Sequence, residues 1–231
     1  MTDSKSISSF RWFHEINPIR IGVRLLAHRE LIWQMARREV GQRYRGSYLG
    51  MLWTLITPIA MLLVYTFVFS LVFRSRWQAD VETPPGEFAL ILFSGLAAFN
   101  FLSEVINRAP TLILSNPNFV KKVVFPLEIL PVVAIVSALV NSLISVALVV
   151  IGGILVLGHV SSTILLLPLA YVPLILMVIG LAWFLSALGV YVRDIGPGIS
   201  IVVQMLFFVS PIFFPVSAAP EWIRPAYALN P

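Results

Sequence analysis

Residues that could carry out covalent chemistry are sparse in this sequence. Cysteine is absent, which excludes thiolate nucleophiles, disulfides and cysteine metal sites. The histidines His14, His28 and His159 are scattered, without the H-E-x-x-H spacing of a zinc site. The G-x-x-x-x-G-K-[ST] loop that cradles nucleotide phosphates is also missing. The sequence therefore predicts a chain that is not an enzyme, holds no catalytic residue, metal or cofactor, and receives any energy it uses from a partner.

Two acids lie near apolar segments, where a carboxylate is costly and suggests function by default. Glu104 can pair with Arg108 one helical turn later, close enough to the membrane edge to be solvated. Glu128 follows Pro126 at the expected start of a helix, where the helix dipole stabilises a carboxylate. A structural role is therefore favoured over proton relay for Glu128.

The elements that position these residues are membrane helices. Of the 231 residues, 58% are hydrophobic and only 12% are charged, against about a quarter in soluble domains. A helix needs about 20 apolar residues to cross the hydrocarbon layer. Five spans are predicted, at residues 50–73, 88–106, 127–157, 163–192 and 199–214. The expected fold class is all-α, a polytopic membrane protein with one transmembrane domain over residues 1–231.

Two of these spans carry irregularities. The third is too long for a straight crossing, so it tilts or begins at the interface. Pro168 and Pro173 are expected to break the fourth.

The basic residues are unevenly distributed along the chain. With a cytoplasmic N-terminus, the inside segments 1–49, 107–126 and 193–198 hold nine, three and one lysines and arginines, which makes 13 of the 16. This imbalance predicts that the N-terminus is cytoplasmic and that residues 215–231 lie outside. It also assigns the net charge of +5 to the membrane surface rather than to nucleic acid.

A basic amphipathic stretch, Arg29 to Ser47, leads directly into the first span. Its apolar residues fall on one half of a helix, and they are Leu31, Ile32, Trp33, Met35, Ala36, Val40 and Tyr44. Glu39 and Arg43 intrude on that half, four residues apart in the order that favours an ion pair between them. The pattern predicts an interfacial helix, and composition favours a lipid anchor over a gate or a docking surface for a partner.

The predicted cytoplasmic loop 107–126 interleaves apolar residues with asparagine, proline and lysine. This mixture predicts a short helix on the cytoplasmic face. Such a helix either inserts into a groove of another protein or simply re-enters the membrane surface, and the residues leave both readings open.

Two further sets of side chains recur within the spans. Ser137, Asn141 and Ser145 share one face of the third span, which is typical of helix packing, with a polar channel lining as the minor alternative. Aromatic residues gather late in the first and fifth spans: Tyr65, Phe67, Phe69, Phe73, Trp77, Phe207, Phe208, Phe213 and Phe214. Interfacial belts explain some of them, and a surplus lining a conduit could stack on sugar rings.

Several stretches together resemble a known family. They are Arg38-Glu39, Arg43-Tyr44-Arg45-Gly46-Ser47, Leu49-Gly50-Met51-Leu52-Trp53 with Pro58, Lys121-Lys122-Val123-Val124-Phe125-Pro126, Val192-Arg193-Asp194-Ile195, Ser210-Pro211-Ile212 and Leu229-Asn230-Pro231. Their order and spacing resemble the permease subunits of type 2 ATP-binding-cassette exporters of cell-surface polysaccharides such as O-antigen, capsular polysaccharide and teichoic acid. The resemblance covers nearly all of the chain from about residue 25.

The resemblance implies a homodimer of six-span subunits in the inner membrane, with ATP and Mg on a separate nucleotide-binding ATPase subunit. It implies a gate formed by Arg37, Arg38, Glu39, Arg43, Tyr44 and Arg45. It implies coupling to the ATPase through Asn116, Asn118, Phe119, Lys121 and Lys122. It implies a glycan conduit lined by Tyr65, Phe69, Phe73, Phe207, Phe208 and Phe213. A sixth span is expected after Pro231, with short helices at the outer exit before it.

The function that this resemblance implies is ATP-driven export of a lipid-linked polysaccharide. One alternative keeps the architecture and exports a lipid or a drug. Another is a membrane scaffold for glycan synthesis that transports nothing. Copurification distinguishes the last from a transporter, because a transporter should bring down an ATPase subunit and a scaffold should bring down a synthase.

Overall fold

The computed structural model describes residues 18–43, 48–72, 86–121, 125–158, 162–192, 194–216 and 219–227. These residues are mostly helical, which confirms the all-α class. The helices are α2 (Pro18–Ala27), α3 (Arg29–Arg43), α4 (Trp53–Tyr65), α5 (Glu87–Arg108), α6 (Pro117–Lys121), α7 (Ile129–Leu157), α8 (Leu167–Tyr191), α9 (Ile195–Val209) and α10 (Arg224–Tyr227). Single-turn 3₁₀ segments are η1 (Gly50–Leu52), η3 (Ala109–Thr111) and η4 (Ser162–Leu166), and a π-helix, η2 (Thr66–Val72), continues α4.

Within the described residues, three helical segments are long and apolar enough to cross a membrane. They are Glu87–Thr111, Ile129–Leu157 and Ile164–Tyr191. Two shorter apolar helices, Trp53–Phe69 and Ile195–Val209, stand where the first and fifth spans were predicted. The chain is therefore a polytopic membrane protein, as its composition indicated.

The helices differ from the prediction in two places. The fourth span is not broken, because α8 runs unbroken from Leu167 to Tyr191. Pro168 lies in the first turn, where no intrahelical donor is needed, and packing of α8 holds the helix together past Pro173. The fifth helix begins at Ile195 rather than at residue 199, so most of the expected inside loop 193–198 is helical.

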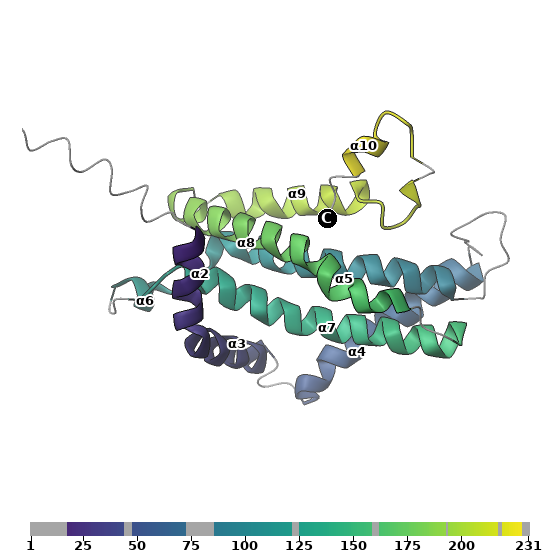
Figure 1. The fold of residues 1–231 in the computed structure, drawn as a ribbon, viewed down its shortest axis with the longest axis horizontal. Coiled ribbons are helices and arrows are strands. Elements are labelled where there is room, and N and C mark those ends of the chain that lie inside the picture. The colour runs from purple at the N-terminus through teal and green to yellow at the C-terminus, as the bar shows by residue number, and fades with distance from the viewer. Residues whose placement is uncertain are drawn as a thin grey trace, which may run out of the picture.

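Helix α5 is the centre of the fold, and α7, α8 and α9 lie alongside it (Figure 1). Phe101 is 1% exposed and packs in one cluster with Ala138 of α7, Val178 of α8 and Val203 of α9. Since lipid is as apolar as these side chains, close packing rather than expulsion from water holds the helices together.

The buried face of α8 also makes a close approach to η3. Leu174, Val178, Ala182, Leu185, Ser186 and Gly189 are buried at helical spacing. A Cβ on Gly189 would lie 2.7 Å from the backbone Cα and C of Pro110 and would overlap its carbonyl oxygen. Only glycine therefore fits where α8 crosses η3.

The segments that were expected to be cytoplasmic gather at one end of the molecule. Figure 1 shows α2, α6 and the turn between α8 and α9 at this end, and α10 at the other. This grouping is the one that the charge distribution requires, while the side of the membrane on which this end lies stays a prediction.

The predicted interfacial helix packs on protein as well as facing outward. Ile32 and Ala36 of α3 are buried against Ile129 and Val133 of α7. Trp33, which the helical wheel placed on the same apolar half, is 59% exposed. Helix α2, which precedes α3, was not predicted from the sequence.

Candidate functional site

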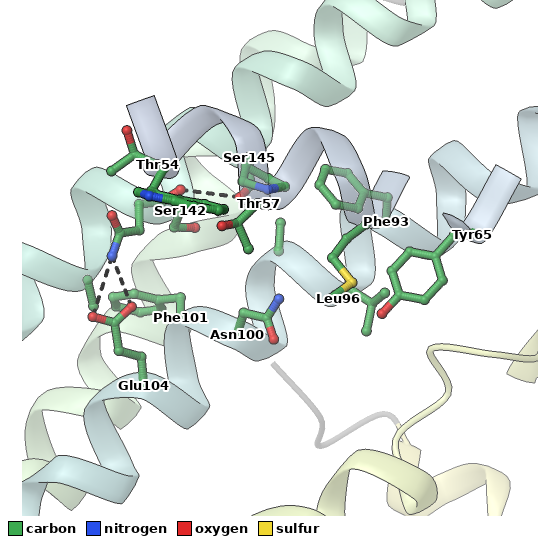
Figure 2. Close-up of a pocket in the computed structure, with 16 residues that line it drawn as sticks. Thr54, Thr57, Tyr65, Phe93, Leu96, Asn100, Phe101, Glu104, Ser142 and Ser145 are labelled. Atoms are coloured by element: carbon green, nitrogen blue, oxygen red, sulfur yellow. Dashed lines mark hydrogen bonds between the residues drawn. The ribbon is translucent and has the colours of Figure 1, made fainter. Parts of the chain in front are cut away.

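A partly polar pocket opens between α4, α5 and α7 (Figure 2). Its volume is about 360 Å³. Each wall is one face of a helix, with residues recurring every three or four positions. The lining is formed by Trp53, Thr54, Thr57, Pro58, Met61, Tyr65, Phe93, Leu96, Ala97, Asn100, Phe101, Glu104, Ala138, Asn141, Ser142 and Ser145.

Two walls of the pocket are firmly held, and the third is not. Helix α5 buries ten of its residues and α7 also buries ten. None of the residues of α4 is buried. Its continuation changes to a π-helix at Thr66, whose hydroxyl donates to the carbonyl oxygen of Leu62 over 2.8 Å. The α4 wall therefore has the least packing to resist displacement.

Some polar groups of the lining satisfy one another. Ser145 Oγ donates to the carbonyl oxygen of Asn141 over 3.2 Å, and Asn141 Nδ2 donates to Glu104 Oε2 over 3.2 Å. The hydroxyls of Ser142 and Tyr171 are 2.9 Å apart. Asn141 Oδ1 has no hydrogen-bond partner among the described residues.

The residues that share one face of α7, Ser137, Asn141 and Ser145, lie in two different environments. Ser137 is fully buried, as the packing interpretation expected. Asn141 and Ser145 instead line the pocket, and a polar channel lining, the minor alternative, stays a prediction. Sequence reasoning did not single out Thr54, Thr57 and Asn100; the signal available was their spacing of three or four residues from other polar positions in apolar segments.

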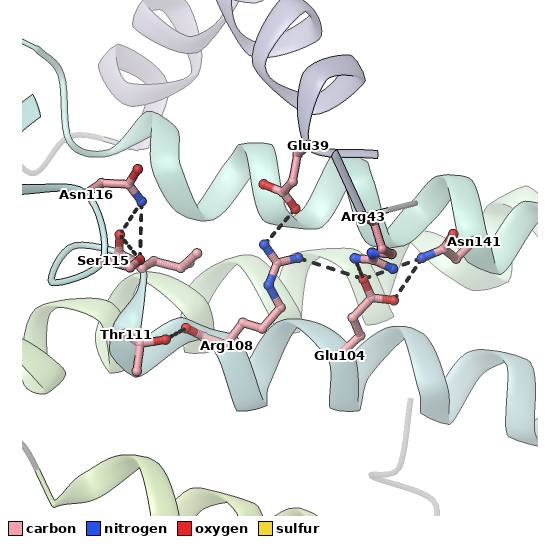
Figure 3. Close-up of polar contacts among 9 residues, drawn as sticks. Glu39, Arg43, Glu104, Arg108, Thr111, Ser115, Asn116 and Asn141 are labelled. Atoms are coloured by element: carbon pink, nitrogen blue, oxygen red, sulfur yellow. Dashed lines mark hydrogen bonds and ion pairs between the residues drawn. The ribbon is translucent and has the colours of Figure 1, made fainter. Parts of the chain in front are cut away.

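A cluster of four charges joins α3 to α5 (Figure 3), and one of its members, Glu104, also lines the pocket. Arg108 Nη2 lies 2.7 Å from Glu39 Oε1, and Arg43 pairs with Glu104. Arg108 Nη1 lies 3.8 Å from Glu104 Oε1, which confirms the predicted pair one turn apart. We name Glu39, Arg43, Glu104 and Arg108 the ionic cluster.

The predicted pairing of Glu39 with Arg43 was wrong. Each of the two contacts an opposite charge on α5 instead. The side chains of the ionic cluster are only 22–33% exposed, so water screens them less than it screens a surface pair. The cluster fixes the end of α3 above the pocket.

The rest of the predicted gate is less connected. Arg37 and Arg38 are exposed on α3. Tyr44 and Arg45 lie outside the described residues. The structure therefore brings two of the six predicted gate residues, Glu39 and Arg43, to the pocket end, and the gating role itself stays a prediction.

Glu128 lies at the start of α7, as predicted. It makes no side-chain capping hydrogen bond, and its Oε1 is 3.8 Å from Nη1 of the exposed Arg24 on α2. Its backbone oxygen accepts a hydrogen bond from Trp183 Nε1 over 3.0 Å, which ties α7 to α8.

The predicted coupling loop contains the short helix α6. Asn116 Nδ2 donates to the carbonyl oxygen of Leu112 over 2.9 Å, which fixes the turn before it. The ring of Phe119 stacks on that of Phe125, with centroids 4.5 Å apart. Asn118 is exposed; Lys121 ends the helix, and Lys122 lies outside the described residues. The short helix is confirmed, while its contact with a partner stays a prediction.

The predicted conduit aromatics from the first and fifth spans meet in one cluster. Tyr65, Phe69, Phe207 and Phe213 pack around Phe88, Leu92, Leu96 and Ile212. The ring centroids of Phe207 and Phe213 are 5.1 Å apart, at an edge-to-face angle of 82°. Phe208 is 66% exposed, although its ring meets that of Phe207 edge to face with centroids 5.3 Å apart, and Phe73 lies outside the described residues. Within one subunit these rings therefore contact one another, and their role as a conduit lining stays a prediction.

Long apolar helices, with the basic segments gathered at one end, define the class of the chain as a polytopic membrane protein. Residues 30–231 match the ABC-2 type transporter family, so the chain belongs to the ABC-2 type transporter family. This confirms the resemblance seen in the sequence.

Relatives of the chain are transport permeases. An O-antigen export system permease protein RfbA of Myxococcus xanthus is 28% identical over 86% of this chain and 74% of its own length. An RfbA of Klebsiella pneumoniae is 24% identical over 87% of this chain and 75% of its own. The polysialic acid transport protein KpsM of Escherichia coli is 25% identical over 80% and 69%.

Proposed function

We propose that the chain is the membrane subunit of an ATP-driven exporter that moves a lipid-linked, O-antigen-like polysaccharide across the inner membrane. The observation that carries this proposal is the similarity to polysaccharide permeases, which extends over 80–87% of the chain. Two copies of the chain form the conduit, and two copies of a separate nucleotide-binding subunit supply ATP hydrolysis. The N-terminus and the α6 loop are cytoplasmic.

The sequence supports a division of labour between subunits. It carries no phosphate-binding loop. Its predicted cytoplasmic segments between spans are at most about 20 residues long, too short for a nucleotide-binding core of their own. These features favour ATP hydrolysis on a separate subunit, and α6, where Phe119 stacks on Phe125, is the segment proposed to contact it.

Purification from the native membrane tests this proposal. The tagged chain should copurify with a nucleotide-binding subunit, and deleting its gene should remove polysaccharide from the cell surface while lipid-linked glycan accumulates inside. Recovery of a glycan synthase without an ATPase would support the scaffold alternative and contradict the proposal. Unchanged surface glycan in the deletion strain, together with loss of another exported lipid or drug, would assign a different cargo.

Replacing Phe119 and Lys121 together with alanine should uncouple the two subunits. Loss of the Phe119 ring removes a stacking contact of about 1 kcal/mol with Phe125 and reduces the surface that α6 offers to the ATPase subunit. We expect glycan export to fall at least tenfold in reconstituted vesicles, with ATP hydrolysis continuing and the subunit still folded. The matched control is Leu114→Ala, an exposed residue of the same loop. Normal export by the double variant would show that α6 is not the coupling element.

A further inference from the structure

We propose that the pocket between α4, α5 and α7 binds a single sugar unit of the exported glycan, one in each subunit. The inference rests on the proposed function and deepens it, because it names a glycan-contacting surface. Of the predicted conduit aromatics this surface includes only Tyr65. Its polar contacts come from residues on all three helices, none of which was assigned to the glycan.

The charge of the lining selects a neutral ligand. Glu104 is the one charged residue among the residues that line the pocket. Its carboxylate already pairs with Arg43 and Arg108 of the ionic cluster and accepts from Asn141. The pocket therefore offers no unpaired cation to a phosphate and no free carboxylate to an amine. The ligand that fits this pocket is therefore polar and uncharged.

The hydrogen-bonding groups match sugar hydroxyls. Among the described residues, the side chains of Asn100 and Thr57 make no hydrogen bond, and Asn141 Oδ1 has no partner either. Polar groups within apolar spans are costly unless a ligand or water completes them. Together the three supply both donors and acceptors, which is what a hydroxyl requires since it both donates and accepts. An acyl chain would leave all three unsatisfied.

The volume of the pocket and the aromatic side chains in its lining also favour a sugar. A volume of about 360 Å³ lies at the small end of the 300–1,000 Å³ typical of ligand sites, so it holds a short piece of a chain and not a folded polymer. Trp53 and Tyr65 lie on the α4 wall, where Trp53 is 42% exposed and offers ring surface. Aromatic surfaces favour the C–H faces of sugar rings for the same reason that they favour other apolar partners.

The loosely packed wall provides the way in. Since no residue of α4 is buried, this helix can move away from α5 and α7 without breaking a packed core. The ionic cluster at the pocket end keeps α3 in place meanwhile. During export, one sugar unit of the polymer binds in the pocket and is released again as the chain advances.

The substitution Asn100→Leu tests the polar contact between the pocket and the glycan. The side chain of Asn100 makes no hydrogen bond within the described protein, so Asn100→Leu should leave folding intact. Glycan export by the complete complex should fall about three- to tenfold, the range of one neutral hydrogen bond. Asn107→Leu is the matched control, because Asn107 is exposed on the same helix away from the pocket and should export normally. Equal export by the two variants would overturn the proposal.

Photocrosslinking in cells identifies the ligand. A photoreactive phenylalanine at Ser145 faces the pocket, and one at Leu143, which is 61% exposed, faces away from it on the same helix. In the complete complex with its ATPase, position 145 should give adducts that stain for carbohydrate, and position 143 should not. Three results would overturn the proposal in cells that export glycan. They are adducts that extract as phospholipid, equal carbohydrate staining at positions 145 and 143, and no adduct at position 145. Cells in which the unmodified complex exports no glycan would instead refute the proposed function.

Discussion

Replacing Gly189 with alanine should lower the free energy of unfolding by about 3 kcal/mol, at the upper end of what overpacking costs. The added Cβ would overlap the carbonyl oxygen of Pro110 and lie 2.7 Å from its Cα and C atoms. Backbone cannot rotate away as a flexible side chain can, so α8 must separate from η3. The larger substitution Gly189→Leu should prevent the folded subunit from accumulating. Thermal unfolding in detergent and the yield of monodisperse protein measure both effects.

Gly180 supplies the control on the same helix. It is exposed, and no atom lies within 4 Å of the Cβ that alanine would add. Gly180→Ala should therefore be neutral or slightly stabilising, by up to about 1 kcal/mol, because alanine has the higher helix propensity. If the Gly189 and Gly180 variants unfolded at the same temperature, the close crossing of α8 and η3 would be wrong.

Replacing Glu104 with lysine should destabilise the end of the pocket by about 2–4 kcal/mol. The change removes the acceptor shared by Arg43, Arg108 and Asn141 and places a third cation beside the two arginines. Two like charges about 4 Å apart repel by about 4 kcal/mol at the effective dielectric of a protein surface, and partial exposure reduces this. Glu104→Gln, which keeps an acceptor oxygen, should cost less. Thermal unfolding and protease cleavage between α3 and α4 report the loss of contact.

Exchanging charges tests whether the contact of α3 with α5 is specific. Glu39→Arg and Arg108→Glu should each destabilise the subunit, and the two together should recover part of the loss because the opposite charges meet again. The recovery should be incomplete, since the carboxylate introduced at position 108 would also face that of Glu104 one turn away. A double variant no better than the sum of the single ones would show that Glu39 and Arg108 do not interact.

The rule that opposite charges four residues apart on a helix form an ion pair was correct where both charges pair on the same helix. The pair Glu104 and Arg108 was predicted from spacing alone and is present. The same rule failed for Glu39 and Arg43, because it considers only neighbours on the same helix while α5 presents the opposite charges to both. The break expected at Pro173 failed for a related reason, since packing of Leu174 and Val178 keeps α8 intact.

The candidate site was predictable only in pieces. Asn141 and Ser145 were noticed because polar residues at helical spacing are unusual within a span. Their neighbours Asn100 and Thr57 lie on other helices, 41 or more positions away in the chain, and no periodicity within one helix can bring these faces together. The aromatics of the first and fifth spans were grouped by type and by depth, and the fold places four of them in one cluster.

The amino-acid sequence was sufficient to predict the membrane class, most of the helical elements, the concentration of positive charge in a few segments and the resemblance to the ABC-2 type family. These follow from composition and from periods of three to four residues, which depend on the local chain and its solvent. The folded structure was needed to learn which charges pair, that Gly189 meets Pro110, and that three helix faces enclose a partly polar pocket. These depend on how the helices are rotated and crossed, which close packing between distant segments sets.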